Sequence, residues 1–321
     1  MDISVIGPGA VGSLLGSLLQ LAGHRVTLRG RSAEPRANYR VVLPGQWLLA
    51  EGVRSAGREE TADSSDAILV TLGRHHLHAE RRPDFARLIG TVESPVVVFN
   101  CDPEETVRLA VPRERLRLGL TLMSAVKLQN ADVELCTEKP VLLYEKAPLL
   151  TRIFPAFTKF GFQLVAVDDL RPYLNSFFVS QLLFLPVAMC NTTVRDFLSY
   201  PEGRELAVSI LSEGFAALQR ADMPLAPLPL MDPGELSLRL QKKPAAFEAD
   251  RGAPERELNS LLQSYLRGKP TEAAQLNRKV VEIASSAGLH LTWNWRIVQK
   301  ANRIASLGFY RDPPELLKAL V

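Results

Sequence analysis

The sequence predicts an α/β N-terminal domain followed by an all-α C-terminal domain. In the first half, short apolar runs alternate with a segment of helix-forming composition, Ala10–Ala22. The apolar runs are Ile3–Ile6, Arg25–Leu28, Ala67–Thr71 and Val96–Phe99. Continuous apolar runs of this length are typical of strands buried on both faces of a parallel sheet. Their alternation with helix predicts an α/β layer.

The pattern changes near Leu170, where strand-like runs give way to long helical stretches. The expected helices are Tyr173–Cys190, Arg204–Ala221, Glu255–Leu266, Thr271–Ala287 and Trp293–Leu307. Recurrent prolines exclude a helix over Met223–Leu230. Because 321 residues suit two domains, we expect one domain over 1–168 and a helical substrate and dimerisation domain over 169–321. Before the change, Arg117–Leu122, Val141–Tyr144 and Gln163–Val167 could extend the sheet.

Composition indicates an ordinary soluble protein. The 38 basic and 35 acidic residues leave a net charge of +3, which demands neither a nucleic acid nor a membrane partner. The three cysteines share no metal-binding spacing, and a reduced, cytoplasmic protein is expected. The most apolar window, Phe177–Cys190, is interpreted as a buried helix. The run Arg74–His78 is interpreted as a polar loop, so no metal site is expected.

A glycine motif opens the predicted α/β domain. The run Gly7-Pro8-Gly9-Ala10-Val11-Gly12 fits G-x-G-x-x-G and lies between a predicted strand and a predicted helix. The first glycine permits a tight turn, the second lets a backbone approach a pyrophosphate, and the third permits close packing of helix and strand. The motif therefore predicts a Rossmann-type domain that holds a dinucleotide on the N-terminus of a helix.

The end of the second predicted strand indicates which dinucleotide binds. An NAD site usually has an acidic residue there for the ribose hydroxyl, and this chain has none. Arg29, Arg31 and Ser32 could instead hold a 2′-phosphate, because guanidinium groups bind phosphate through two hydrogen bonds. The cofactor predicted from these residues is NADP(H). Solvated arginines in a loop are the other interpretation.

The chain resembles the ketopantoate reductase (2-dehydropantoate 2-reductase) family. The resemblance begins with Ile3–Gly16 and Gly23-His24, and continues at Val97–Asn100, which resembles the strand before the family's Asn-Gly pair. Near the C-terminus, Ser260-Leu-Leu-Gln263 precedes Thr271-Glu272 with the spacing of a family signature.

The resemblance implies reduction of a small 2-oxo acid with NADPH, as in the step from ketopantoate to pantoate in pantothenate biosynthesis. It implies that Asn100 lies near the nicotinamide and the substrate, that Ser260 binds the substrate carboxylate, and that Glu272 binds a substrate hydroxyl. Thr71 and Leu72, at the end of the third predicted strand, complete the expected cofactor contacts. A homodimer is an assembly that the sequence allows.

One departure from the family concerns the general acid. Counting back from Pro186 places Phe177 at the position of the family's lysine. Phenylalanine supplies neither a charge nor a proton to the developing alkoxide. Lys127, Lys242 and Lys243 are replacement donors only if loops bring them to the site.

Two functions therefore stay open. The first is an NADPH-dependent reductase of a 2-oxo acid. The second is a redox-silent relative or sensor that retains NADP(H) and has lost turnover, as Phe177 suggests.

Overall fold

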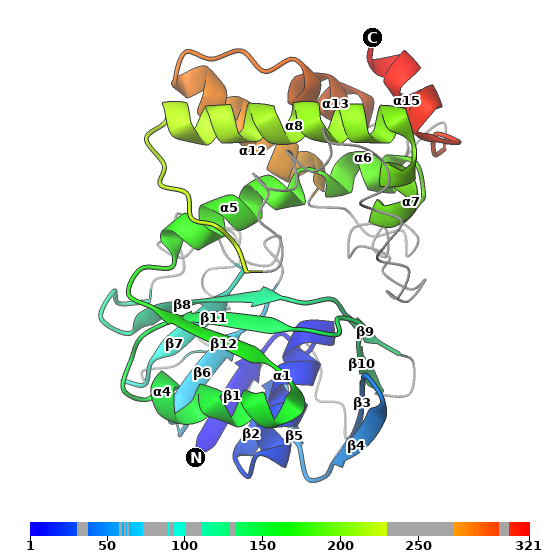
Figure 1. Ribbon diagram of the computed structural model, residues 1–321. Coiled ribbons are helices and arrows are strands. Elements are labelled where there is room, and N and C mark those ends of the chain that lie inside the picture. Colours follow the sequence, from blue (N-terminus) through cyan, green and yellow to red (C-terminus); the bar gives the residue numbers. More distant parts are fainter. Residues whose placement is uncertain are drawn as a thin grey trace. The chain divides into compact units, whose positions relative to one another are not determined.

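The computed structural model describes residues 1–30, 38–57, 60, 62, 64–72, 89, 93–100, 111–128, 132–229, 273–301 and 308–321. The chain divides into two compact units, Met1–Leu170 and Arg171–Val321. The first is an α/β unit and the second is helical (Figure 1), so the predicted fold class is confirmed.

An eight-stranded sheet forms the centre of the first unit. Its strand order is β12-β11-β8-β7-β6-β1-β2-β5. The six strands from β8 to β5 run parallel, and β11 joins β8 in the antiparallel direction with β12 parallel to β11. The strand bounds are β1 Asp2–Ile6, β2 Arg25–Arg29, β5 Arg54–Ala56, β6 Ala67–Val70, β7 Val96–Phe99, β8 Leu116–Leu122, β11 Val141–Glu145 and β12 Gln163–Val167.

Both faces of this sheet are buried. Val5 and Leu69 belong to one hydrophobic cluster, whereas their chain neighbours Ile6 and Val70 belong to another. Side chains alternate between the two faces of a strand, so each run must be apolar throughout. This is the physical reason why the strands appear in the sequence as continuous apolar runs.

A second, four-stranded sheet was not predicted. Its order is β4-β3-β10-β9, with β3 at Tyr39–Leu43, β4 at Gln46–Ala50, β9 at Ala125–Lys127 and β10 at Val133–Leu135. Helix α1, Ala10–Leu21, packs against both this sheet and β1 and β2 of the large sheet. Two of these strands have only three residues each, which is too short to give a clear hydrophobic period. Two short helices, α4 (Leu150–Ile153) and η3 (Phe154–Phe160), lie between β11 and β12 in the chain.

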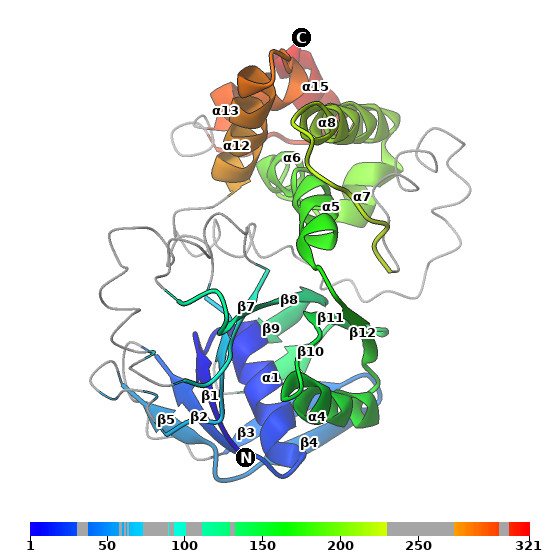
Figure 2. The same cartoon turned by 90° about the vertical axis from the view of Figure 1, so that its left-hand side faces the viewer.

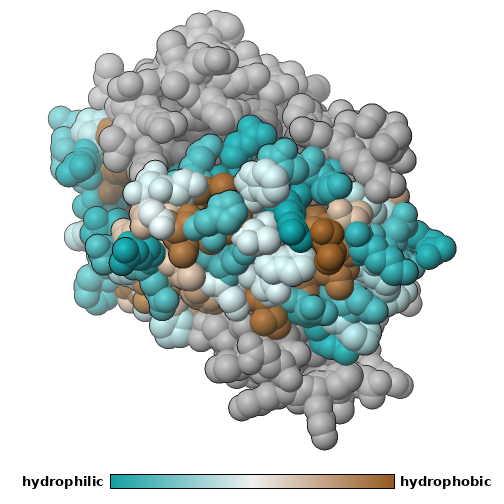
Figure 3. Space-filling model, turned by 90° about the horizontal axis from the view of Figure 1, so that it is seen from above, coloured by the Kyte–Doolittle hydropathy of each residue, from teal (hydrophilic) through white to brown (hydrophobic). Residues whose placement is uncertain are grey.

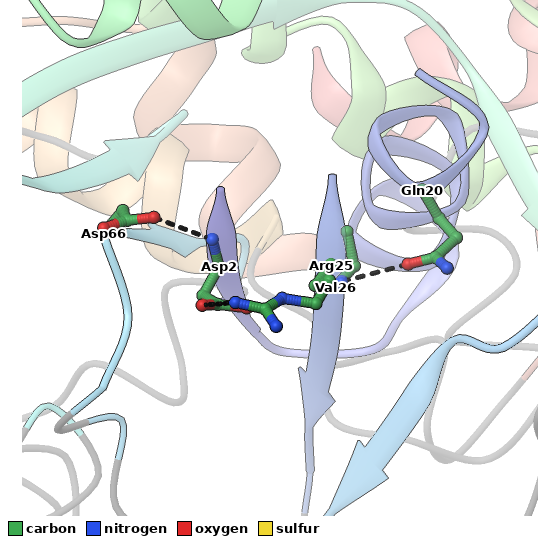
Figure 4. A network of polar contacts seen from close by, with 5 residues as sticks. All are labelled: Asp2, Gln20, Arg25, Val26 and Asp66. Carbon is green, nitrogen blue, oxygen red and sulfur yellow. Dashed lines mark hydrogen bonds and ion pairs between the residues drawn. The ribbon is translucent and has the colours of Figure 1, made fainter. Parts of the chain in front are cut away.

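Polar contacts tie together the amino ends of β1 and β2 (Figure 4). Asp66 accepts the Asp2 N–H at 2.8 Å, and the Asp2 carboxylate pairs with Arg25. Gln20, on the last turns of α1, accepts the Val26 N–H at 3.0 Å. These contacts lie at the ends of β1 and β2 opposite the glycine motif.

The helical unit is arranged around α8, which packs against α5, α7, α12, α13 and α15 (Figures 1 and 2). The bounds are α5 Arg171–Gln181, α6 Phe184–Met189, α7 Val194–Ser199, α8 Pro201–Arg220, α12 Ala273–Ser286, α13 Trp293–Ala301 and α15 Pro313–Leu320. On the described surface seen in Figure 3, hydrophobic residues are interspersed among hydrophilic ones. Such a surface is expected of helices that turn one apolar stripe inward.

The predicted helix over Tyr173–Cys190 is broken in the structure. It forms α5 and α6, with a turn at Leu182 and Leu183 between them. Pro186 has no N–H to donate to the Leu182 carbonyl four residues earlier. The buried Asn277 side chain donates to that carbonyl instead, at 3.2 Å.

Arg171–Met189 also has the length and mean hydropathy of a membrane span among the described residues, but 72% of its most apolar window is buried. That degree of burial is typical of a core helix. The predicted helix over Glu255–Leu266 lies outside the described residues, whereas 223–229 is non-helical as its prolines predicted.

Candidate dinucleotide site

The candidate site lies along one edge of the large sheet. Gly7 follows β1, Arg29 ends β2, Thr71 follows β6 and Asn100 follows β7. These four strands are neighbours and run parallel, in the order β7-β6-β1-β2. Their carboxyl ends therefore meet at one edge, where ligands of open α/β sheets bind.

The glycine loop is held tightly from both sides. Gly7 has a positive φ of 99°, and its N–H donates to the Arg29 carbonyl at 3.0 Å. Thr71 donates its hydroxyl to the Gly7 carbonyl at 2.8 Å. A Cβ at Gly7 would lie 2.9 Å from a methyl group of Leu72. The loop therefore requires glycine at this position for both its conformation and its space.

Gly12 and Gly9 differ in their surroundings. A Cβ at Gly12 would lie 2.2 Å from the Gly7 oxygen and 2.3 Å from the Thr71 hydroxyl, so no side chain fits there. A Cβ at Gly9 would meet no described atom within 4 Å. Gly12 therefore serves internal packing, whereas Gly9 borders open space next to the helix.

Helix α1 begins at this open space without a side-chain cap. Gly9 is its N-cap residue, no side-chain cap hydrogen bond forms, and its first turn has no acidic residue. The leading N–H groups of a helix need acceptors, and they carry a partial positive charge. The diphosphate of a dinucleotide fits this set of donors.

Arg29 occupies a different environment from the one expected of a phosphate ligand. Its side chain is buried, with 5% exposure, and it donates to the Ser4 hydroxyl at 2.9 Å and to the Glu60 carbonyl at 3.0 Å. The guanidinium thus joins β1 to the segment that follows β5. Arg31 and Ser32 lie outside the described residues.

Asn100 has a left-handed backbone conformation and a side-chain amide that both donates to and accepts from Thr121. Its φ is +56°, in the left-handed region, and its N–H donates to the Gly119 carbonyl at 2.9 Å. The side-chain amide donates to the Thr121 hydroxyl at 2.9 Å and accepts the Thr121 N–H at 2.8 Å. A non-glycine residue at positive φ persists where its surroundings hold it, often at a functional site.

Lys127, one of the three lysines named as replacement donors, contacts the glycine loop. Its ammonium donates to the Pro8 carbonyl at 3.0 Å, within the glycine loop, and lies 5.9 Å from the centre of the Tyr39 ring. The loop and Lys127 are 119 residues apart in the chain. No local pattern joins them, because the contact depends on the packing of α1 against the four-stranded sheet.

The expected substrate residues are described in part. Ser260 and Glu272 lie outside the described residues, as do Lys242, Lys243 and the Arg74–His78 run. Phe177 is half-buried on α5, between the buried residues Ser176 and Phe178. No group of three metal-ligating side chains occurs within the described part of the chain.

The fold and the loop define a Rossmann-type dinucleotide-binding protein with a helical C-terminal unit. Residues 3–145 match the family described as ketopantoate reductase PanE/ApbA, and residues 185–305 match its C-terminal domain. The chain belongs to the ketopantoate reductase family.

Solved structures with the same fold span almost the whole chain. A 2-dehydropantoate 2-reductase from Geobacter metallireducens has a TM-score of 0.76 at 18% identity and covers 94% of this chain and 99% of its own. A ketopantoate reductase of the PanE/ApbA family from Ralstonia eutropha has a TM-score of 0.75 at 16% identity. The match covers 95% of this chain and 98% of its own. A D-mandelate dehydrogenase solved with NADH and anilino(oxo)acetate has a TM-score of 0.76 at 15% identity. The match covers 94% of this chain and 97% of its own. No curated protein matches this sequence.

Proposed function

We propose that the protein is an NADPH-dependent reductase of a small 2-oxo acid, with ketopantoate as the first candidate substrate. The observation that carries the proposal is the glycine loop at the carboxyl edge of the sheet, followed by the uncapped α1, in a chain of the ketopantoate reductase family. The similar D-mandelate dehydrogenase, solved with NADH and an oxoacetate, supports the wider class of 2-oxo acid chemistry.

The bound cofactor would supply hydride, and the chain's residues would position the reactants. The N–H groups of the first turn of α1 would hold the diphosphate, with Gly7–Gly12, Thr71 and Leu72 forming the surrounding wall. Asn100 would lie near the nicotinamide, with its amide orientation maintained by Thr121. Ser260 would bind the substrate carboxylate and Glu272 a substrate hydroxyl.

Preference for NADPH over NADH would rest on Arg31 and Ser32, with Arg29 in support. The Arg29 carbonyl anchors Gly7, and its guanidinium is engaged with Ser4 and Glu60. The residue would therefore shape the loop more than contact the 2′-phosphate. The proposed arrangement assigns 1–168 to NADP(H) binding and 169–321 to substrate binding and dimerisation, in a cytoplasmic protein. The dimeric ketopantoate reductase of Staphylococcus aureus supports a homodimer.

The second candidate function is a redox-silent protein or sensor that binds NADP(H) without turnover. Phe177 favours it, because the described part of α5 carries no proton donor in the place of the family's lysine. Lys127, the described candidate among the three replacement lysines, contacts the glycine loop. That contact suits a role with the cofactor rather than with the substrate carbonyl.

The deciding experiment measures NADPH consumption over a panel of 2-oxo acids, with ketopantoate first, alongside direct titration of NADPH and NADH. Turnover of any panel member supports the reductase. Tight NADPH binding without turnover supports the redox-silent protein. If neither nucleotide binds, both functions are excluded.

A further inference from the structure

We propose that Lys127 is a ligand of the dinucleotide's diphosphate, acting from the four-stranded sheet together with the N-terminus of α1. The inference rests on the proposed function, because it needs a dinucleotide at the glycine loop. It assigns a binding role to a residue that the glycine motif does not contain.

The position of the ammonium carries the proposal. Lys127 Nζ lies 3.0 Å from the Pro8 carbonyl oxygen, and Pro8 directly precedes Gly9, the glycine that borders open space. Ser13, on the first turns of α1, donates its hydroxyl to the same carbonyl at 3.1 Å. Lys127 thus reaches the part of the loop beside the first turn of α1.

The charge at this position also indicates an anion. Positive groups are normally favoured at the C-terminus of a helix and disfavoured at its N-terminus, where the helix already carries partial positive charge. Here a lysine reaches the N-terminal end of α1, and the first turn of that helix offers no acidic residue. A diphosphate bound there would interact favourably with both positive groups.

The ammonium can make more than one contact. A lysine ammonium has three N–H donors, so the hydrogen bond to the Pro8 carbonyl is compatible with a second one to a phosphate oxygen. On its other side the ammonium lies 5.9 Å from the Tyr39 ring centre. Tyr39 is buried at the start of β3, which limits how far the lysine can turn away from the loop.

The test uses the full-length protein with three variants: Lys127→Gln, which keeps a neutral donor, Lys127→Arg, which keeps the charge, and Lys159→Gln as the control. Lys159 is an exposed lysine of the same unit. Dissociation constants are measured for NADPH, NADH and ADP-ribose, which share the diphosphate and differ in the 2′-phosphate and the nicotinamide. Each titration is repeated at low and high salt, and thermal unfolding without nucleotide confirms that the variants fold.

We expect Lys127→Gln to raise the dissociation constants of all three ligands by a similar factor, on the order of 10-fold, since one charge-assisted hydrogen bond is lost. The affinity of this variant should also depend less on salt than that of the unmodified protein. Lys127→Arg should retain most of the affinity, and Lys159→Gln should change nothing.

Three results would overturn the assignment while leaving the proposed function intact. The first is an unchanged affinity of Lys127→Gln for all three ligands. The second is a loss of affinity for NADPH alone, which would mean contact with the 2′-phosphate. The third is a loss of affinity with unchanged salt dependence, which would mean a structural role alone. If the unmodified protein binds none of the three nucleotides, the proposed function fails first, and the inference fails with it.

Discussion

At the scale of single residues, Phe177 decides between the two candidate functions. Its side chain is half-buried, so a lysine there can bury its stem while its ammonium reaches toward solvent or a substrate. We expect Phe177→Lys to raise ketopantoate turnover by at least about 10-fold, because general acid catalysis contributes roughly 10²–10⁴-fold. Steady-state NADPH oxidation measures the change, with Phe177→Met as a control of similar size that cannot donate a proton. A folded but inactive Phe177→Lys protein would indicate that more than one residue has been lost.

Variants of Arg29, the last residue of β2, and of Arg31 should have separate effects on stability and on cofactor preference. Arg29→Met removes the donors that serve the Ser4 hydroxyl and the Glu60 carbonyl, and we expect it to lower the free energy of unfolding by roughly 1–3 kcal/mol. Arg31→Ala should leave stability unchanged and remove most of the preference for NADPH over NADH. Urea unfolding and nucleotide titration measure the two effects. Equal preference for both nucleotides in the unmodified protein would contradict this assignment of roles.

Cys190 is expected to be an unreactive thiol. Burial, with smaller contributions from Asp312 and Glu315, raises the pKa of Cys190 from 9.0 to about 12. Because the thiolate is the reactive form, iodoacetamide at pH 8 should label Cys190 only after denaturation, as detected by mass spectrometry. Labelling of Cys190 in the native protein at pH 8 would contradict this expectation.

The same pKa shift predicts a pH dependence of stability. The folded-state pKa of Cys190 is raised, so its contribution is complete below pH 9, the unfolded value, and is lost as the pH rises toward 12. A Cys190→Ala variant should lack this part of the alkaline loss, although it also leaves a small cavity.

At the scale of elements, the glycine loop and α1 form the part of the site whose geometry is fully described. Gly12→Ala would drive a methyl group into the Gly7 oxygen and the Thr71 hydroxyl, so we expect a loss of stability together with loss of nucleotide binding. Gly9→Ala meets no described atom. It should leave the stability of the nucleotide-free protein unchanged and weaken only the binding of NADPH, because the methyl group would occupy space needed by the diphosphate. Thermal unfolding with and without NADPH distinguishes the two, and unimpaired NADPH binding by Gly9→Ala would place the diphosphate elsewhere.

A network of polar side chains connects the helices of the second unit. Asn277 donates to the Leu182 carbonyl and to Asn294, which in turn donates to Glu213 at 2.9 Å. Glu213 also accepts the N–H groups of Thr292 and Trp293 at the start of α13. This network therefore connects the break between α5 and α6 with α8, α12 and α13, and it satisfies backbone groups that the helices leave unpaired.

At the scale of the whole molecule, each unit has its own hydrophobic core. One cluster runs from Phe178 to Leu320, and the two others lie between Ile3 and Phe162. We therefore expect calorimetry to resolve two unfolding transitions. Saturating NADPH at about 100 times its dissociation constant should stabilise the α/β unit by about 2.7 kcal/mol. Asn277→Ala should lower the midpoint temperature of the transition of the helical unit, because the Leu182 carbonyl loses its donor. A single transition that responds to both changes would show that the two units unfold together.

The sequence by itself determined the class of fold, the glycine loop and the family resemblance. Each of these depends on short-range patterns: apolar runs that must be buried on both faces, glycines required by one turn, and motif spacings within one segment. Gly7, Gly9 and Gly12 could be assigned distinct roles in advance because the backbone conformation of the loop is a local property.

Only the tertiary structure decided the contacts between distant segments. In the folded protein the Arg29 side chain is buried against Ser4 and Glu60. Short strands form a second sheet that was not predicted, and Lys127 contacts Pro8, 119 residues away in the chain. The second sheet and the Lys127 contact depend on how α1 packs between two sheets, and packing partners far apart in the chain leave no periodic trace in the sequence. A lysine that the sequence offered as a loop-borne proton donor is therefore, in the folded protein, a neighbour of the dinucleotide loop.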